Sequence, residues 1–299
     1  MKRTFVFMFL ISASLFAQSA GSSGEAFLKF GFGARNIAMS DLGVVAANDL
    51  SALNYNPSLL AVNNKTQLSF THNSLFQDLS SEMFGGSFNA LGLPFAIGIN
   101  TTTVSNIEVR LKPGDPISTF NAHYFETSIS SAFQVSENIF AGASFKYIYE
   151  NIFSDNAVGY GIDFGVTYQK LIDGLTIGAS LRNIGSMNQL RTESTKLPAD
   201  FRIGGAYNFS LKEYNLDFTA LAGFQKYTLQ NDSHIHFGAE AVYQKMFALR
   251  LGFVSGYDSK SISAGFGVFW HGINLDYAYV PVKYGLGDSH IITFTYTFD

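Results

Sequence analysis

Two histidines and a glutamate in one stretch are the first residues here whose types and spacing could do chemistry. His234, His236 and Glu240 share one face of the alternating run His234–Gln244. Two imidazoles and a carboxylate are ligands that zinc accepts. Glu240, however, lies four residues beyond His236, which is about 13 Å along a strand. We therefore predict no metal site and no cofactor.

Motifs for catalysis are not found elsewhere in the sequence. It has no nucleophile elbow and no phosphate-binding loop, and Gly31-Phe32-Gly33 lacks the strand-turn-helix context of a dinucleotide fingerprint. Because the chain has no cysteine, disulfides, thiolate metal sites and a cysteine nucleophile are excluded. A net charge of −4 offers no basic surface for nucleic acid. We predict a protein that is not an enzyme and binds no nucleic acid.

Charged residues recur on one face of alternating runs. In Phe247–Val254, for example, Leu249 and Leu251 oppose Arg250. The same alternation assigns a polar lumen face to Glu126, Lys146, Glu150, Asp163, Arg182, Arg202, Asp217, His234, His236, Glu240, Arg250 and Asp276. Acids and bases are mixed, so we interpret this face as a network of paired charges. The alternative is a selective or substrate-guiding interior.

The elements that must position these residues are long alternating strands. Hydrophobic residues make up 47% of the chain and charged residues only 14%, and the mean hydropathy is +0.13. The alternating runs have about 9–11 residues, the length of a tilted strand that crosses a bilayer. This pattern favours an all-β, antiparallel, up-and-down transmembrane barrel of about fourteen strands over a secreted β-sandwich.

Connection lengths support the barrel. Tight turns such as Ser136-Glu137-Asn138 alternate with longer connections, which include 104–122 and 183–198. We assign the tight turns to the periplasm and the longer connections to the outer surface. The predicted strand centres are Ser69, Gly86, Ile97, Ile129, Phe145, Phe164, Ile177, Gly204, Ala220, Ala239, Leu251, Gly265, Leu275 and Thr295.

The N-terminus has the pattern of an export signal. Lys2 and Arg3 precede an apolar stretch from Phe5 to Phe16, and small residues follow. We predict a signal peptide over residues 1–20, cleaved between residues 17 and 20, an N-terminal hatch or plug over 21–64, and the barrel over 65–299. The predicted location is the outer membrane, with lipid around the barrel.

The hatch segment carries several candidate functional residues. We expect Arg35 and Asp49 to pair with lumen charges, and Asn56-Pro57 to form the turn into the first strand. The alternative interpretation is that these four residues belong to a gate. Phe27, Phe30 and Phe32 are candidates for an apolar pocket between hatch and wall. The many strand glycines either relieve crowding at bends or let the hatch backbone approach the wall.

The final strand has a pattern of its own. Phe294, Tyr296 and Phe298 alternate with threonines close to the C-terminus. This resembles the signal that the outer-membrane assembly machinery reads. We expect that machinery to be a partner.

Several motifs resemble the PorV/PorQ family of outer-membrane proteins, whose barrels are similar to the FadL group. The motifs are Glu25-Ala26-Phe27-Leu28-Lys29, Gly33-Ala34-Arg35, Asp49, Asn56-Pro57, Arg182-Asn183-Ile184-Gly185, and Leu197-Pro198 before Phe201-Arg202-Ile203-Gly204. The resemblance implies a barrel with an inward-folded hatch. It also implies an accessory of type IX protein secretion or surface delivery, with secretion subunits or exported cargo as partners. The alternative that it implies is a FadL-like transporter of hydrophobic small molecules.

Overall fold

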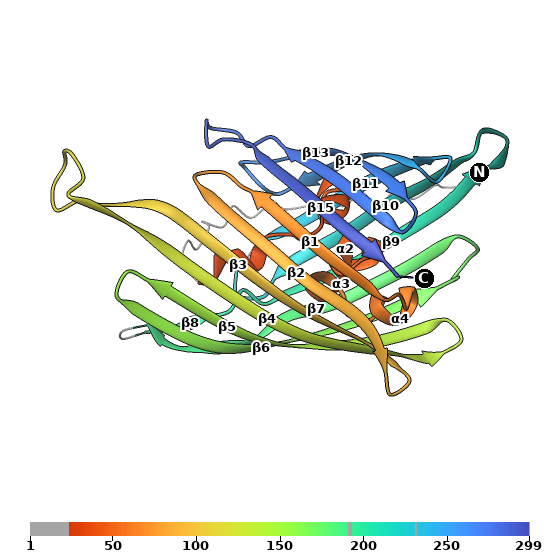
Figure 1. Cartoon of the computed structure of the whole chain (residues 1–299), viewed down its shortest axis with the longest axis horizontal. Helices are drawn as coiled ribbons and strands as arrows, with labels where there is room; N and C mark the ends of the chain where they lie inside the picture. Colours follow the sequence, from red (N-terminus) through yellow and green to blue (C-terminus); the bar gives the residue numbers. More distant parts are fainter. Residues whose placement is uncertain (1–23, 191–192, 231, 299) are drawn as a thin grey trace, which may run out of the picture.

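The wall of the molecule is one closed antiparallel sheet (Figure 1). The computed structural model describes residues 24–190, 193–230 and 232–298. Its strands are β1 (Gln67–Ser74), β2 (Leu79–Ala90), β3 (Leu93–Val109), β4 (Ser118–Ser136), β5 (Ile139–Ile152), β6 (Asp155–Gln169), β7 (Leu175–Leu190), β8 (Glu193–Lys196), β9 (Asp200–Leu211), β10 (Leu216–Tyr227), β11 (Ser233–Tyr243), β12 (Phe247–Ser255), β13 (Ile262–Trp270), β14 (Ile273–Val280) and β15 (Ser289–Thr297).

Strand pairing follows the chain. The pairings β1–β15 and β6–β7 close the sheet. Of the 15 strands, β8 pairs only with β7, so the other fourteen form the wall of the described barrel. Every predicted strand centre, from Ser69 in β1 to Thr295 in β15, lies in one of these fourteen strands. The predicted barrel is therefore confirmed.

Side chains alternate between the two faces of the wall. On β12, Leu249 and Leu251 are 70% and 66% exposed on the outside, whereas Arg250 between them is 1% exposed. Large apolar residues outside and charges inside are the reverse of a water-soluble sheet, and they are typical of a transmembrane barrel. No helix among the described residues has the length and apolar character needed to cross a membrane.

The barrel is taller on one side. Strands β3 to β7 have 14 to 19 residues, whereas β12 to β15 have 8 or 9. The β3–β4 hairpin projects beyond the other strands at the left of Figure 1. We call this end, which we assigned to the outer surface, the tall end.

Two predicted long loops are mostly strand. The predicted loop 104–122 is wrong because β3 runs to Val109 and β4 begins at Ser118. The predicted loop 183–198 is also wrong, since it holds the end of β7 and all of β8. A bulge between Val104 and Ile107 shifts the alternation, and the strands continue beyond bilayer length. Sequence periodicity alone does not follow a strand through such a shift.

The hatch, described from residue 24 to residue 64, lies in the lumen. It forms a 3-10 helix η1 (Ala26–Lys29) and the short helices α1 (Ala34–Ala38), α2 (Gly43–Ala46), α3 (Ala52–Tyr55) and α4 (Leu59–Asn63); a further 3-10 turn, η2 (Lys212–Tyr214), joins β9 and β10. Helix α1 packs on β12 to β15, α2 on β7 and β9, and α4 on β3 to β6. Because these strands surround the lumen, the hatch occupies its interior (Figure 1).

A belt of inward-facing glycines receives the hatch. Nine strands contribute one glycine each, and a Cβ atom added at any of them would contact a hatch atom. These glycines are Gly98, Gly142, Gly165, Gly178, Gly204, Gly223, Gly238, Gly252 and Gly265. At Gly142 that Cβ would lie 2.6 Å from the carbonyl carbon of Pro57. Of the two predicted uses of the glycines, close approach of the hatch is the one seen here.

Candidate functional site

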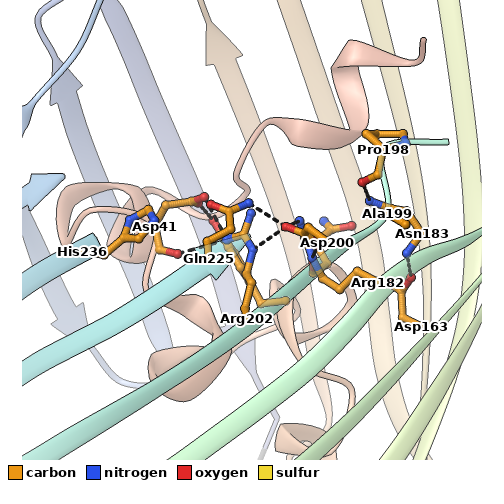
Figure 2. A network of polar contacts seen from close by, with 12 residues as sticks. Asp41, Asp163, Arg182, Asn183, Pro198, Ala199, Asp200, Arg202, Gln225 and His236 are labelled. Carbon is orange, nitrogen blue, oxygen red and sulfur yellow. Dashed lines mark hydrogen bonds and ion pairs between the residues drawn. The ribbon is translucent and has the colours of Figure 1, made fainter. Parts of the chain in front are cut away.

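Asp200 at the start of β9 is the centre of a buried charge network (Figure 2). Its carboxylate accepts two hydrogen bonds from Arg182 at 2.8 and 2.9 Å, one from Arg202 at 2.9 Å, and one from Gln225 at 2.6 Å. Arg182 also donates to the carbonyl oxygen of Asn54 in the hatch. Two cations and an amide thus converge on one carboxylate that is shielded from water.

Arg202 extends this network into the hatch. It donates to the Asp41 carboxylate at 3.0 Å, and the Tyr55 hydroxyl donates to the other oxygen of Asp41. The Tyr55 hydroxyl also accepts from the backbone N–H of Phe32 at 3.1 Å. Burial by itself would raise the pKa of Asp41, but Arg202 and Lys260 hold it below its usual range. The hatch therefore carries a charged anchor for the wall.

A second ion network joins the hatch to the opposite strands. Arg35 in α1 donates to both oxygens of Glu240, at 2.9 and 2.6 Å. Arg250 donates to Glu240 at 2.6 Å and to Asp276 at 2.6 Å. Arg35 also donates to the carbonyl oxygen of Ala46. The expected pairing of Arg35 with a lumen charge is present in this geometry.

Asp49, Asn56 and Pro57 have other surroundings than we expected. Asp49 accepts from the N–H and the hydroxyl of Ser51, within the hatch. The expected pairing of Asp49 with a lumen charge is therefore not found among the described ion pairs. Asn56-Pro57 lies between α3 and α4 and not at the turn into β1. Asn56 donates to the carbonyl oxygens of Val44 at 2.8 Å and Val166 at 3.3 Å, which ties two hatch segments to β6.

The remaining predicted lumen residues form smaller groups. Lys146 pairs with Asp163 at 2.7 Å and donates to Asn183 at 3.0 Å. Glu126 faces the same lumen region, near Lys146. Asp217 lies at the rim beside the β9–β10 turn and accepts from Ser210 at 2.5 Å, outside the buried networks. Glu150 lies near the tall end and faces the hatch residue Glu25.

The two histidines are buried among aromatic and backbone groups. His236 Nδ1 lies 2.6 Å from the carbonyl oxygen of Ser40. The ring of His234 stacks on Tyr257 at a centroid distance of 3.6 Å. Glu240 pairs with arginines as described above. Over the described ranges, no three His, Cys, Asp or Glu residues are grouped as metal ligands.

The three candidate phenylalanines do not share one pocket. Phe27 is buried in a cluster with Leu28, Ile148, Ala157, Met187 and Leu197, against which Phe30, Tyr124 and Leu190 pack. Phe32 belongs to a different cluster, with Leu50 and Leu53. The expected single pocket is therefore wrong for Phe32. We call the cluster around Phe27 the outer cluster.

An apolar pocket lies at the tall end, next to the outer cluster. It has a volume of about 390 Å³ and is lined by Val109, Phe120, Ile152, Phe153, Asp155 and Leu190. Phe120 lies two positions before the inward-facing residue Ala122, and Ile152 lies two positions after the inward-facing Glu150, so both face the lumen side. Leu190 belongs to the pocket lining and also packs against the outer cluster.

Several residues of the site were missed in the sequence. Asp200 and Gln225 were not assigned to the network, and Asp41 and Tyr55 in the hatch carried no motif of their own. Asp200 could have been assigned to the lumen face from its position directly before Phe201-Arg202, where the alternation of β9 begins. Glu25 was noted only as part of a family motif.

Near the outer cluster, Glu25 and Glu150 bring two carboxyl groups together. Both residues are 3% exposed, and Glu150 is the acidic neighbour of the Glu25 carboxyl group. Burial raises the pKa of Glu25 to about 9, and Glu150 adds to the rise. Neighbouring carboxylates disfavour double ionisation, so Glu25 keeps its proton at neutral pH.

The closed barrel with a lumenal hatch resembles solved channels and transporters in its fold. The chain superposes on the toluene transporter TodX of Pseudomonas putida with a TM-score of 0.63 and 13% identity, covering 89% of this chain and 98% of that one. The CymD monoaromatic hydrocarbon channel superposes with a TM-score of 0.58 and 13% identity, covering 90% of this chain and 98% of that one. A FadL homologue of Pseudomonas aeruginosa superposes with a TM-score of 0.52 and 13% identity, covering 89% of this chain and 98% of that one. At these identities the likeness concerns the fold.

By sequence, the chain belongs to the family of unknown function DUF5723, whose model matches residues 94–273. No curated protein matches the chain in sequence. Of the resemblance drawn from the sequence, the FadL-like barrel is supported, whereas membership of PorV/PorQ stays a prediction. The solved neighbours named above are channels and transporters, and our expectation that the chain is not an enzyme also stays a prediction.

Proposed function

We propose that this protein is an outer-membrane channel that admits hydrophobic small molecules, with the hatch as its gate. The apolar pocket at the tall end is the observation that carries the proposal. Its lining leads, through Leu190, to the outer cluster, and two of that cluster's residues, Phe27 and Leu28, belong to the hatch. A ligand that enters there meets the movable part of the channel directly.

The fold supports the same function. The proteins named toluene transporter and monoaromatic hydrocarbon channel share the barrel architecture. The outer face of this barrel is apolar, in keeping with outer-membrane lipid as its surroundings. In this proposal, the alternation of Phe294, Tyr296 and Phe298 serves insertion by the assembly machinery. The predicted signal peptide lies outside the described residues.

Passage requires the hatch to move. The hatch packs against strands from β3 to β15, and two ion networks anchor it at Arg35 and Asp41. Asn56 and Pro57 lie directly against Gly165 and Gly142 of the wall. We assign gating to a shift of this segment relative to the glycine belt.

A reversible disulfide tests the gate. A Cβ added to Gly24 would lie 3.5 Å from the Cβ of Thr195, which suits a disulfide. The chain has no other cysteine, so the double variant Gly24→Cys with Thr195→Cys forms only this bond. Host cells with the double variant are assayed for uptake of radiolabelled toluene, 4-phenylbutan-1-ol and 4-phenylbutylamine under oxidising and reducing conditions.

We expect oxidation to lower uptake to the level of cells without the protein, and reduction to restore it. The single variants Gly24→Cys and Thr195→Cys are the matched controls and should respond to neither treatment. Equal uptake by the oxidised and reduced double variant would contradict the gate. Uptake that never exceeds background for any probe in the wild type would contradict the channel.

The type IX secretion role stays a prediction from resemblance, and the comparisons do not support it. Affinity purification from native outer membrane, with mass spectrometry of proteins and small molecules, separates the two functions. Recovery of secretion subunits or exported cargo would favour the accessory role. Recovery of an apolar compound without a protein partner would favour the channel.

A further inference from the structure

The acidic residue Glu150 lies two strand positions from the apolar pocket, and the hatch residue Glu25 is its neighbour. Ile152 lines the pocket, and Glu150 is the next residue on the same face of β5. Two residues of strand span about 7 Å. Glu25 belongs to the hatch, and its carboxyl meets that of Glu150 from the lumen side. Neither carboxyl group lines the pocket, so the inner end of a bound molecule reaches the pair by extending about 7 Å beyond Ile152.

Glu25 has no donor for its buried carboxyl oxygens. Neither oxygen receives a hydrogen bond from any donor within the described ranges, although the residue is 3% exposed. Glu150 accepts from the Thr195 hydroxyl at 3.3 Å. Buried polar groups are normally hydrogen-bonded, because leaving them without a partner costs free energy. The pair thus has unused capacity to bind a donor.

The neighbouring lysines are engaged elsewhere. Lys146, four residues before Glu150 on β5, pairs with Asp163 at 2.7 Å. Lys29 donates to Gln230 at 2.9 Å and lies 4.9 Å from the ring centre of Tyr227. Neither lysine is hydrogen-bonded to Glu25 or Glu150 in these contacts. Lys196, whose carbonyl oxygen accepts from the Gly24 N–H, is exposed. We therefore expect the cation for the carboxyl pair to come from a ligand.

Aromatic rings complete the surroundings of the pair. Tyr124 lies close enough to be influenced by both Glu25 and Glu150. Its ring is 5.2 Å from that of Phe27. An ammonium group is attracted to carboxylates and to aromatic faces alike. A carboxylate ligand would instead add a second negative charge beside a buried acidic pair that already carries one.

We propose that the ligand of this channel is a hydrophobic amine, with its ammonium group between Glu25 and Glu150 and its apolar part in the pocket above. This inference rests on the proposed channel function and narrows its substrate class. Because Glu25 is part of the hatch, the ligand's charged end contacts the gate itself. Neutral hydrocarbons and alcohols are weaker ligands, and carboxylic acids are the weakest.

Calorimetric titration of the purified full-length protein in detergent tests the proposal. The probes are 4-phenylbutylamine, 4-phenylbutan-1-ol and 4-phenylbutanoate, which share one apolar group and differ in the end group. We expect the amine to bind roughly tenfold or more tightly than the acid, as a hydrogen-bonded charge pair allows. Amine binding should also release a proton at pH 7, measured in buffers of different ionisation heat, whereas alcohol binding should not.

Variants locate the site. Glu25→Gln and Glu150→Gln should each weaken amine binding roughly tenfold and change alcohol binding by less than about threefold. Glu137→Gln, at an exposed turn of the opposite end, is the matched control and should change neither. The comparison of the three probes on the wild type needs no variant, so it tests the preference for the amine even if a variant fails to fold.

The outcomes separate this inference from the channel function. Acid or alcohol bound as tightly as the amine would overturn the amine specificity and leave the channel intact. Amine binding that survives both glutamine substitutions, or releases no proton, would overturn the assigned site. Binding of none of the three probes would overturn both the inference and the ligand pocket of the proposed function.

Discussion

Arg35 of the hatch and Glu240 of β11 form a two-point ion pair, with Nε–Oε2 at 2.9 Å and Nη2–Oε1 at 2.6 Å. The residues are 205 positions apart in the chain. The pair fixes α1 against the wall, and Arg250 shares the same carboxylate. It is therefore both a hatch anchor and part of the wall's own charge network.

Replacing Arg35 with alanine should loosen the hatch. Removing one partner of a buried pair costs about 3–5 kcal/mol, and less here because Arg250 still neutralises Glu240. We expect greater sensitivity of cells to large antibiotics and detergents. Arg110→Ala, which breaks the exposed pair with Glu108 at 2.6 Å, is the control and should leave permeability unchanged. Unaltered permeability in Arg35→Ala would count against the gate.

Asp200→Asn should be more damaging than any single change at the rim. Asp200 accepts hydrogen bonds from Arg182, Arg202 and Gln225, and its loss leaves two buried arginines short of a counter-charge. We expect a loss of about 3–5 kcal/mol in the free energy of unfolding, measured by urea titration in detergent. Asp217→Asn, on the neighbouring strand rim, should stay within about 0.5 kcal/mol. Equal effects of the two variants would show that the network does not stabilise the fold.

A methyl group at Gly142 should push the hatch away from the wall. The added Cβ would lie 2.6 Å from backbone atoms of Pro57 and Ser58, which cannot move aside as a side-chain end can. We expect Gly142→Ala to destabilise the protein by about 1–3 kcal/mol in the same urea titration. Gly161→Ala, also facing the lumen, meets its nearest atom at 3.5 Å and should be nearly neutral. The opposite ranking would refute the role of the belt.

Docking of η1 should weaken as the pH rises. The pKa of Glu25 is about 9 in the folded protein and 4.5 ordinarily, so the folded state holds the proton more tightly. The resulting stabilisation is complete below pH 4.5 and is lost as the pH rises towards 9. Hydrogen exchange of the Leu28 amide, corrected for its intrinsic pH dependence, should therefore quicken between pH 5 and pH 9. Glu25→Gln should abolish this trend, and the Ala46 amide, in α2 near the opposite end of the barrel, should not show it. If exchange of the Leu28 amide still quickened with pH in Glu25→Gln, another titrating group would be its cause.

The sequence predicted the barrel well because strand alternation is a local property. Leu249, Arg250 and Leu251 indicate their faces by spacing alone, and the wall follows from repeating that pattern. The partners across the lumen were not predictable in the same way. Asp41 pairs with Arg202, which is 161 residues away, and no local period connects them. The hatch path depends on contacts of this kind, so the place of Asn56-Pro57 was mispredicted, and the expected pairing of Asp49 is not found among the described ion pairs.

The glycine belt also bears on how the molecule is assembled. At the level of the belt, much of the wall has no side chains of its own to fill the bore, and hatch atoms occupy that space. The hatch precedes β1 in the chain, and the ring is completed only when β1 pairs with β15, the last strand made. The N-terminal segment is thus synthesised before the strand that completes the ring. In the folded barrel this segment fills the bore at the level of the belt, so a chain that lacked it would enclose a backbone-lined hole.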